Sequence, residues 1–286
     1  MFRLHIVGAG TPTPAAKRFG TCYIIEAGDD VLMFDCGPAA TYKMTLMDLA
    51  PTAVGHLFFS HHHFDHNADY PCFLLTRWDQ AAGKADDLKV YGPRPTARVT
   101  ERLIGKDGAF FPDWQARVEH PGSREIFEKR GGHLPRRPPA VDIRELDTGD
   151  EVSGDRWSVT CTRVRHIEPW MPTLAYRFEH EGLTLVISSD TGFCQSIVNL
   201  ATGADYLLVH CWDIQEKMRP AEAGMIAGTL QAAEIAQKAG VRHLILSHLS
   251  PLLDFPDNRQ KALDDVAGVF DGDVKFAEEL FTLRIE

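Results

Sequence analysis

The chain has 286 residues, 44% of them hydrophobic and 24% charged, which is typical of a soluble globular protein with a sizeable core. Its formal net charge is -10 and no basic run exceeds Arg136-Arg137, which argues against a general nucleic-acid binder but leaves a local basic groove open. No stretch approaches the roughly 18 to 20 apolar residues that span a bilayer, so no membrane partner is expected. The N-terminus reads at once as strand and Gly/Pro turn, and the six cysteines form no CxxC pair, which predicts a cytoplasmic protein with reduced thiols.

The first 60 residues alternate short β-like runs with turns and predict a meander of strands. A helix is expected over residues 39–49, and a short buried strand over residues 56–59. Residues 78–140 are rich in Arg, Gly and Pro and lack the alternation of strands. We therefore interpret them as a loop or cap segment, or as an insert that makes a dimer contact.

The strand pattern returns from residue 141 onward. One helix is expected over residues 221–239, where Gly240 ends it, and another over residues 259–269 before a final strand. Two strand-rich halves, each closed by helices, suggest an α+β fold built as a four-layer αβ/βα sandwich, although periodicity alone indicates only mixed α and β. The whole chain, 1–286, is expected to form a single domain that carries the insert.

The strongest chemical signal is a cluster of metal-capable side chains at the end of an apolar strand. His61, His63, Asp65 and His66 lie within six residues. In an extended segment His61 and His63 point to the same side, so both imidazoles can reach one metal ion. Asp65 and His66 can then face a second ion. The alternative, a solvated histidine-rich loop, does not explain this spacing.

Three further side chains stand where other predicted strands end: His166, Asp190 and His248. Each one alone is more readily explained as a surface or capping residue than as a metal ligand. Because all three share the context of the histidine run, together they predict the remaining ligands of a metal site.

These motifs resemble the ribonuclease Z branch of the metallo-β-lactamase superfamily, over roughly residues 4–250. The resemblance rests on the segments GAGTPTPAAKRFGTCYIIE, VLMFDCG, FFSHHHFDH, VYGP, SSDTG and HLILSHLSP. It implies the metallo-β-lactamase sandwich and a metal-dependent hydrolase.

The resemblance also implies a ligand set for two ions. One ion would be held by His61, His63 and His166, and the second by Asp65, His66 and His248. Asp190 is implied to bridge the two ions. The implied ions are two zinc per chain, with manganese or iron as alternatives. Such ions lower the pKa of bound water toward about 7, which supplies a hydroxide nucleophile beside the catalytic Asp65. Asp35 is implied as a carboxylate that orients a ligand histidine, the alternative being a strand-end turn residue.

The chain departs from the ribonuclease Z pattern in two places. Only 23 residues separate His166 from Asp190, which leaves no room for the long arm that grips tRNA in that branch. Cys211 and Ala227 stand at the positions of a Glu and a His that protonate the leaving oxygen. With an acidic chain, tRNA is therefore not expected as a partner, whereas a small-molecule substrate is. A homodimer is implied by the family.

Four aromatic residues flank the predicted ligands and suggest an aromatic or otherwise apolar substrate, unless they merely pack the mouth of the sandwich: Phe64, Trp170, Phe193 and Trp212. His210 ends an apolar strand and is expected to face the site, as a catalytic residue that donates a hydrogen bond to a developing oxyanion.

The leading hypothesis is a hydrolase whose metal-bound hydroxide attacks a small ester, lactone, aryl sulfate, phosphodiester or haloaromatic compound. One alternative is a ribonuclease Z-like phosphodiesterase. Another is a non-catalytic, metal-stabilised binding protein.

Overall fold

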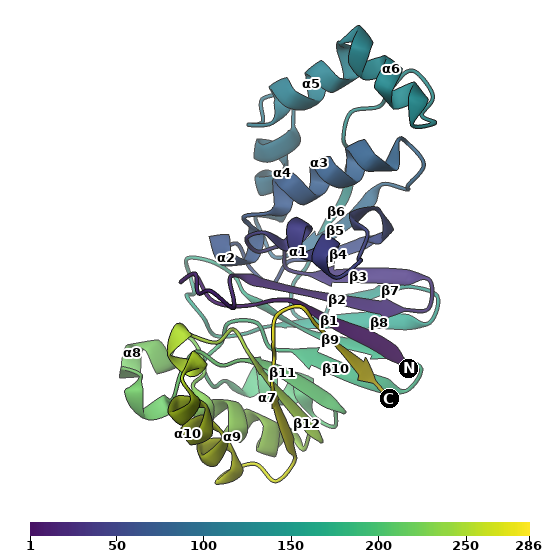
Figure 1. The fold of residues 1–286 in the computed structure, drawn as a ribbon. Helices are drawn as coiled ribbons and strands as arrows, with labels where there is room; N and C mark the ends of the chain where they lie inside the picture. The colour runs from purple at the N-terminus through teal and green to yellow at the C-terminus, as the bar shows by residue number, and fades with distance from the viewer.

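The computed structural model describes residues 1–286 and contains two seven-stranded sheets packed face to face (Figure 1). The first sheet has the order β14-β1-β2-β3-β4-β5-β6. Its strands are β1 (Phe2–Ala9), β2 (Thr21–Ala27), β3 (Asp30–Phe34), β4 (His56–Phe58), β5 (Leu88–Gly92), β6 (Val141–Glu145) and β14 (Phe281–Ile285). The pairs from β14 to β3 are antiparallel, and those from β3 to β6 are parallel.

The second sheet has the order β13-β12-β11-β10-β9-β8-β7. Its strands are β7 (Glu151–Ser153), β8 (Trp157–Arg163), β9 (Leu174–His180), β10 (Leu183–Ile187), β11 (Tyr206–His210), β12 (His243–Ser247) and β13 (Asp273–Phe276). Strands β7 to β10 form an antiparallel meander, and β10 to β13 are parallel. Both sheets thus contain a parallel half whose carboxyl ends can present side chains along one edge.

Helices cover the outer faces of the two sheets (Figure 1). The first half contains α1 (Ala40–Leu46), α2 (Phe64–Asn67), α3 (Tyr70–Ala81), α4 (Thr96–Ile104), α5 (Phe111–Glu119) and α6 (Pro121–Lys129). The second half contains α7 (Gln195–Ala201), α8 (Pro220–Ala223), α9 (Thr229–Ala239) and α10 (Pro256–Ala267), with short 3-10 turns at 51–53, 215–217 and 251–254. No helix is long and apolar enough to cross a membrane.

Three buried apolar interfaces hold the layers together. Between the sheets, Phe58 packs edge-on against Tyr176 with ring centroids 5.6 Å apart. On the outer face of the first sheet, a second cluster includes Phe73 of α3, and the third, beyond the other sheet, includes Ile235 of α9. Two sheets with a helical layer on each outside are four layers, so the expected αβ/βα sandwich is confirmed.

The structure differs from the sequence analysis in two helical regions. Residues 78–140, expected as loop or cap, contain β5 and the helices α4, α5 and α6, which project beyond the first sheet (Figure 1). These short helices begin or end at Pro and Gly, which hid their periodicity. The single helix expected over 221–239 is two, α8 and α9, separated by a segment in which Ala227 pairs with Cys211 as an isolated β-bridge.

Candidate metal centre

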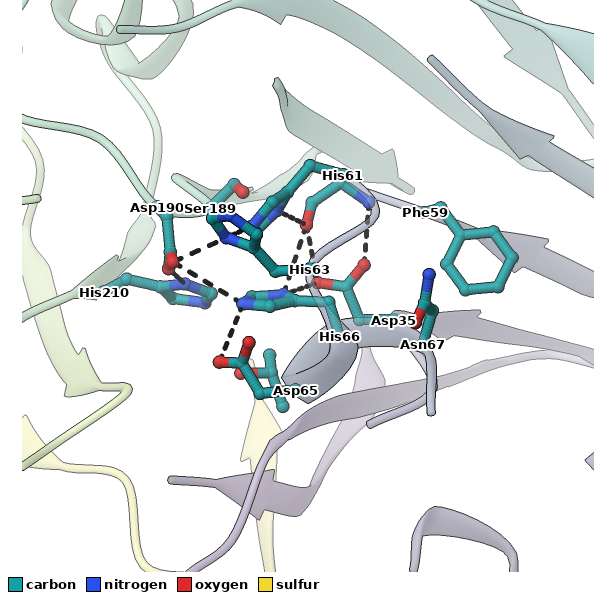
Figure 2. Close-up of polar contacts among 12 residues, drawn as sticks. Asp35, Phe59, His61, His63, Asp65, His66, Asn67, Ser189, Asp190 and His210 are labelled. Atoms are coloured by element: carbon teal, nitrogen blue, oxygen red, sulfur yellow. Dashed lines mark hydrogen bonds and ion pairs between the residues drawn. The ribbon is translucent and has the colours of Figure 1, made fainter. Parts of the chain in front are cut away.

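The predicted ligands meet at one edge of the sandwich because each follows the end of a strand. His61 comes three residues after β4, His166 three residues after β8, and Asp190 three residues after β10. His248 directly follows β12. The side chains come from both sheets, so the centre lies across the two halves of the fold (Figure 2).

One group of donor atoms has its members within 4.8 Å of one another: His61, His63, His166 and Asp190. The Nδ1 of His63 lies 2.9 Å from His61 Nε2 and 3.2 Å from His166 Nε2. The Oδ2 of Asp190 lies 3.9 Å from His61 Nε2 and 3.7 Å from His166 Nε2. Three imidazole nitrogens and one carboxylate oxygen form a donor set that zinc accepts.

A second group shares Asp190 with the first: His66, Asp190, His210 and His248. Asp65 adjoins it, since its Oδ2 lies 3.1 Å from His248 Nε2 and 3.5 Å from His66 Nε2. The Nε2 of His248 lies 3.5 Å from Asp190 Oδ1. The structure therefore brings all seven predicted ligands together, with Asp190 at the contact between the two groups.

Asp35 holds two of the imidazoles in place from behind (Figure 2). Its Oδ2 accepts hydrogen bonds from His66 Nδ1 and from the hydroxyl of Ser60, each at 2.7 Å, and its Oδ1 accepts the backbone N–H of Ser60 at 2.7 Å. Since the Ser60 hydroxyl donates to Asp35, it can accept from His61 Nδ1 at 3.0 Å. Both histidines then carry the lone pair on Nε2, which faces the cluster.

The unpaired polar atoms of the site fit a bound cation. The Nε2 of His66 is buried without a hydrogen-bond partner, although it lies 3.5 Å from Asp65 and 3.6 Å from Asp190. The Oδ1 of Asp65 is also buried and unpartnered. A lone pair directed at two carboxylates is unfavourable unless positive charge lies between them. The donor chemistry of the cluster therefore suits a divalent metal ion, with zinc favoured by the nitrogen ligands.

The pKa values of these groups show the same demand for positive charge. Burial lowers the pKa of His66, but Asp35 and Asp190 more than reverse this and raise it well above its ordinary value. Burial raises the pKa of Asp190, yet His248 and His66 hold it well below the usual range. Burial lowers the pKa of His61, which keeps that imidazole neutral. The raised pKa of His66 means that a proton on this ring partly balances the negative charge of the carboxylates around it when no cation does so.

His210 lies behind Asp190 and does not face a substrate. Its Nδ1 contacts Asp190 Oδ1 at 2.7 Å, and its Nε2 contacts the Tyr23 hydroxyl at 3.0 Å, which in turn lies 2.7 Å from the Ser247 hydroxyl. Burial lowers the pKa of His210 to about 4, so the ring is neutral and Nδ1–H donates to the carboxylate. Both ring nitrogens already have partners within the protein, so the hydrogen bond from His210 to an oxyanion stays a prediction that this arrangement does not favour.

Backbone strain is concentrated at the ends of the strands that carry the site. Asp35, Ser189 and His248 all adopt the left-handed conformation, with φ values of 59°, 58° and 55°. Such conformations persist in non-glycine residues where surrounding structure enforces them, often at functional sites. Gly37 is required for a related reason, since a Cβ there would collide with the carbonyl oxygen of Asp65.

The four aromatic residues expected around the substrate have different surroundings. Trp212 lies beside the cluster, its ring centroid 6.0 Å from that of His248. Phe64 and Trp170 are exposed, at 53% and 87%. Phe193 packs against the core of the second half, and Lys238 of α9 lies 4.7 Å above its ring. Phe193 thus packs against the core, which is the alternative that the sequence left open.

Both departures from the ribonuclease Z pattern are visible in the structure. The segment between His166 and Asp190 is occupied by the β9–β10 hairpin. Cys211 and Ala227 form a parallel bridge and are fully buried. Burial raises the pKa of the Cys211 thiol, so the thiol holds its proton tightly and is a poor general acid at neutral pH.

Three polar residues of the site were missed from the sequence: Tyr23, Ser60 and Ser247. Tyr23 and Ser247 lie within strands that read as ordinary core, and no local signal marks them. Ser60 directly precedes the histidine run, where the need for a group that orients the ring nitrogens could have indicated it. His62, which lies between two of the predicted ligands, points away from the cluster, and its Nε2 lies 2.9 Å from the Thr96 hydroxyl.

Comparisons with known proteins agree with this geometry. A family model described as beta-lactamase superfamily domain matches residues 31–249. Ribonuclease Z of Mycolicibacterium gilvum (strain PYR-GCK) is 29% identical over 100% of this chain and 96% of its own. The fold is similar to that of the metallo-beta-lactamase fold protein YhfI from Bacillus subtilis, with a TM-score of 0.75 and 19% identity over 99% of this chain and 98% of that one. It is also similar to that of human tRNase Z, short form, with a TM-score of 0.69 and 19% identity over 99% of both chains.

These relatives overturn the expectation that tRNA is not a partner. Ribonuclease Z enzymes match the chain along its whole length, and one of the similar structures is a tRNase Z. The expectation relied on the missing arm, on the missing proton-donor pair and on a net charge of -10. The net charge sums over the whole surface and does not report where basic residues gather. The match of the family model over most of the chain, with these relatives, shows that this protein is a hydrolase of the metallo-β-lactamase superfamily and belongs to its ribonuclease Z-like branch.

Proposed function

We propose that this hydrolase is a divalent-metal-dependent phosphodiesterase that cleaves a phosphodiester bond in RNA. The observation that carries the proposal is the pair of donor clusters that share Asp190. Two adjacent cation sites suit a phosphodiester, because its attacking and leaving oxygens both develop negative charge. Relatives of full length that are ribonuclease Z enzymes support RNA as the substrate.

We propose one ligand set for each of two ions, most simply zinc. His61, His63 and His166 would hold one ion, Asp65, His66 and His248 the other, and Asp190 would bridge them. When bound, such ions polarise the phosphoryl group and activate a water molecule at neutral pH. Manganese or iron would accept the same donors.

The chain's own residues would position the site and move a proton. Asp35 and Ser60 fix which ring nitrogen of His66 and His61 faces the centre. His210, anchored by Tyr23, fixes the Oδ1 of Asp190. The unpartnered Oδ1 of Asp65 is the oxygen we assign to accept a proton from the attacking water.

One observation favours a second candidate function. Because Cys211 and Ala227 provide no efficient proton donor, the leaving oxygen would depart most easily when its own pKa is low. A small substrate with an acidic leaving group meets this condition, as in an aryl phosphodiester, aryl sulfate, activated ester, lactone or haloaromatic compound.

The test is metal content combined with a substrate panel. Protein purified without chelator is analysed for zinc, manganese and iron, and assayed on a precursor tRNA with a 3′ trailer, bis(p-nitrophenyl) phosphate, aryl sulfates, lactones and chloronitroaromatics. Turnover of RNA with about two ions per chain would support the proposal. Turnover of one of the small substrates, the aryl phosphodiester included, without turnover of RNA would establish the second candidate, and bound metal with a silent panel would favour a metal-stabilised binding protein.

A matched pair of variants links turnover to the site. Asp65→Asn should lower kcat by about 10²- to 10⁴-fold, the usual effect of removing a proton acceptor. His62→Gln is the control, because His62 lies within the same run but contacts Thr96 and Asn67 instead of the cluster. Equal losses in both variants would contradict the assignment of Asp65.

A further inference from the structure

A second cavity lies outside the metal centre, in the region that projects from the first sheet. It has a volume of about 420 Å³ and is formed by the end of α3, the turn before β5, α6 and the segment that leads into β6. This volume falls within the range of small-ligand pockets. Its basic lining residues are Arg77, Lys84, Arg136 and Arg137, and its acidic ones are Asp86 and Asp87.

The cavity and the metal centre are at opposite ends of the first sheet. Strands β4, β5 and β6 are parallel, and the histidine run follows the carboxyl end of β4. The cavity is lined by Leu88 and Val141, the first residues of β5 and β6. Helix α3 runs between the two ends, and its 12 residues span about 18 Å. A small molecule in the cavity therefore cannot reach the metal centre.

Two buried guanidinium groups form the inner wall of this cavity. Arg77 is 7% exposed and forms no ion pair, since its Nε and Nη2 donate only to the backbone oxygens of Val54 and Asp86. Burial lowers the pKa of Arg77, and the nearby carboxylates of Asp87 and Asp86, which raise it, do not offset this effect. Buried charges are normally paired directly with a carboxylate, whereas no carboxylate forms an ion pair with Arg77.

Arg136, also 7% exposed, is held as a flat donor between two aromatic rings. Its guanidinium carbon lies 3.9 Å from the Trp78 centroid and 4.8 Å from that of Phe127. One amino group donates to Asp79 at 2.7 Å, but the buried Nε has no partner. Asp79 already accepts from Arg130 as well, so it neutralises Arg136 only in part.

The rim adds positive charge that no carboxylate of the chain pairs directly. Lys84 and Arg137 are exposed and form no ion pair, and the Nζ of Lys84 donates only to the backbone oxygen of Arg130, at 3.3 Å. The exposed Asp86 and Asp87 oppose them, so the lining carries four cations against two carboxylates. In a chain of net charge -10, a concave site with excess positive charge and unused guanidinium donors selects an anion.

We propose that this cavity is a binding site for a small phosphate-bearing anion, such as inorganic phosphate or a mononucleotide. Arg77 and Arg136 would contact the phosphate from the inner wall, because guanidinium groups match phosphate oxygens in geometry. Lys84 and Arg137 would attract it at the rim. The proposal does not depend on which bond the metal centre hydrolyses.

Calorimetric titration of the metal-loaded protein with inorganic phosphate and with AMP tests the site. The variant is Lys84→Gln with Arg137→Gln, since both side chains are exposed and their loss should leave the fold intact. The control is Arg124→Gln on α6, an exposed cation outside the cavity. The Kd for phosphate or AMP should rise at least tenfold in the double variant and stay unchanged in the control. Both proteins should keep the turnover and the melting temperature of the wild type.

Three outcomes would overturn the proposal. Binding of phosphate and AMP that is equally tight in the double variant would place the anion at the metal centre instead. Equal weakening in Arg124→Gln would show a general charge effect. If neither small anion binds but a short RNA oligonucleotide does, and loses affinity in the double variant, the patch contacts an RNA backbone and not a small ligand. Turnover of the substrate panel is measured separately, so failure here leaves the proposed function standing.

Discussion

Replacing Asp35 by Asn should weaken metal binding without unfolding the protein. The carboxylate accepts three hydrogen bonds at 2.7 Å, from Ser60 N–H, the Ser60 hydroxyl and His66 Nδ1. The amide of Asn has only one oxygen, so its NH2 group would face donors in place of an acceptor. Asn also tolerates the φ of 59° at this position, so the backbone need not move.

The size of the effect follows from these contacts. A hydrogen bond to a charged group contributes about 1.5–3 kcal/mol, and loss of a group that orients a metal ligand typically lowers affinity by about 10- to 100-fold. That range corresponds to about 1.4–2.7 kcal/mol, which agrees with the loss of the His66 contact alone. We therefore expect Asp35→Asn to raise the Kd for zinc by about 10- to 100-fold.

Competition with a chromophoric chelator measures this Kd, and circular dichroism checks the fold. Ser60→Ala is the matched control, because it keeps the bond between Asp35 and His66 but removes the hydroxyl that donates to Asp35 and accepts from His61. Its Kd should rise less than that of Asp35→Asn. A folded Asp35→Asn protein with wild-type affinity, or a larger loss in Ser60→Ala, would refute the orienting role of Asp35.

Three further predictions concern stability and turnover. Burial lowers the pKa of His56 to about 4, so the unfolded state binds a proton that the folded state does not between pH 6.5 and 4. As the pH falls from 6.5 to 4, the free energy of unfolding should therefore fall by about 1–3 kcal/mol. Denaturant titration at several pH values should show that His56→Phe lacks this part of the pH dependence, and an unchanged pH dependence in the variant would contradict the prediction. Asp79→Asn removes the shared partner of Arg130 and Arg136, and should destabilise the helical projection by about 3 kcal/mol, read as faster proteolysis within residues 111–137; wild-type resistance would argue against it. Tyr23→Phe should lower kcat by about tenfold with KM unchanged, because His210 loses one of its two anchors, and an unaltered kcat would show that Tyr23 only fills space.

The donor residues of the candidate centre could be predicted because much of their signal is local. His61, His63, Asp65 and His66 lie within six consecutive positions, and strand ends at a common edge bring distant donors to the same place. The orientation of each ring could not be predicted in this way. It depends on partners such as Tyr23, which lies in a strand far from the histidine run and meets His210 only through the packing of the two sheets.

The helical projection and the second cavity were also beyond sequence reasoning. Helices α4 to α6 have only nine residues each and few buried ones, and their Pro and Gly ends read as loop. Arg77 and Arg136 look like ordinary surface cations in the sequence. Their burial results from tertiary contacts with Val54, Trp78 and Phe127.

The spread of the donor residues along the chain has a consequence for biosynthesis. The first donor is residue 61 and the last is residue 248, and neither sheet alone carries a complete set. During translation the histidine run leaves the ribosome long before the strand that ends at His248. Closing so long a loop costs entropy that only docking of the two sheets repays. Metal capture is therefore a late step of maturation, and a nascent chain that stalls before its last strands would carry exposed histidines without the centre that they build.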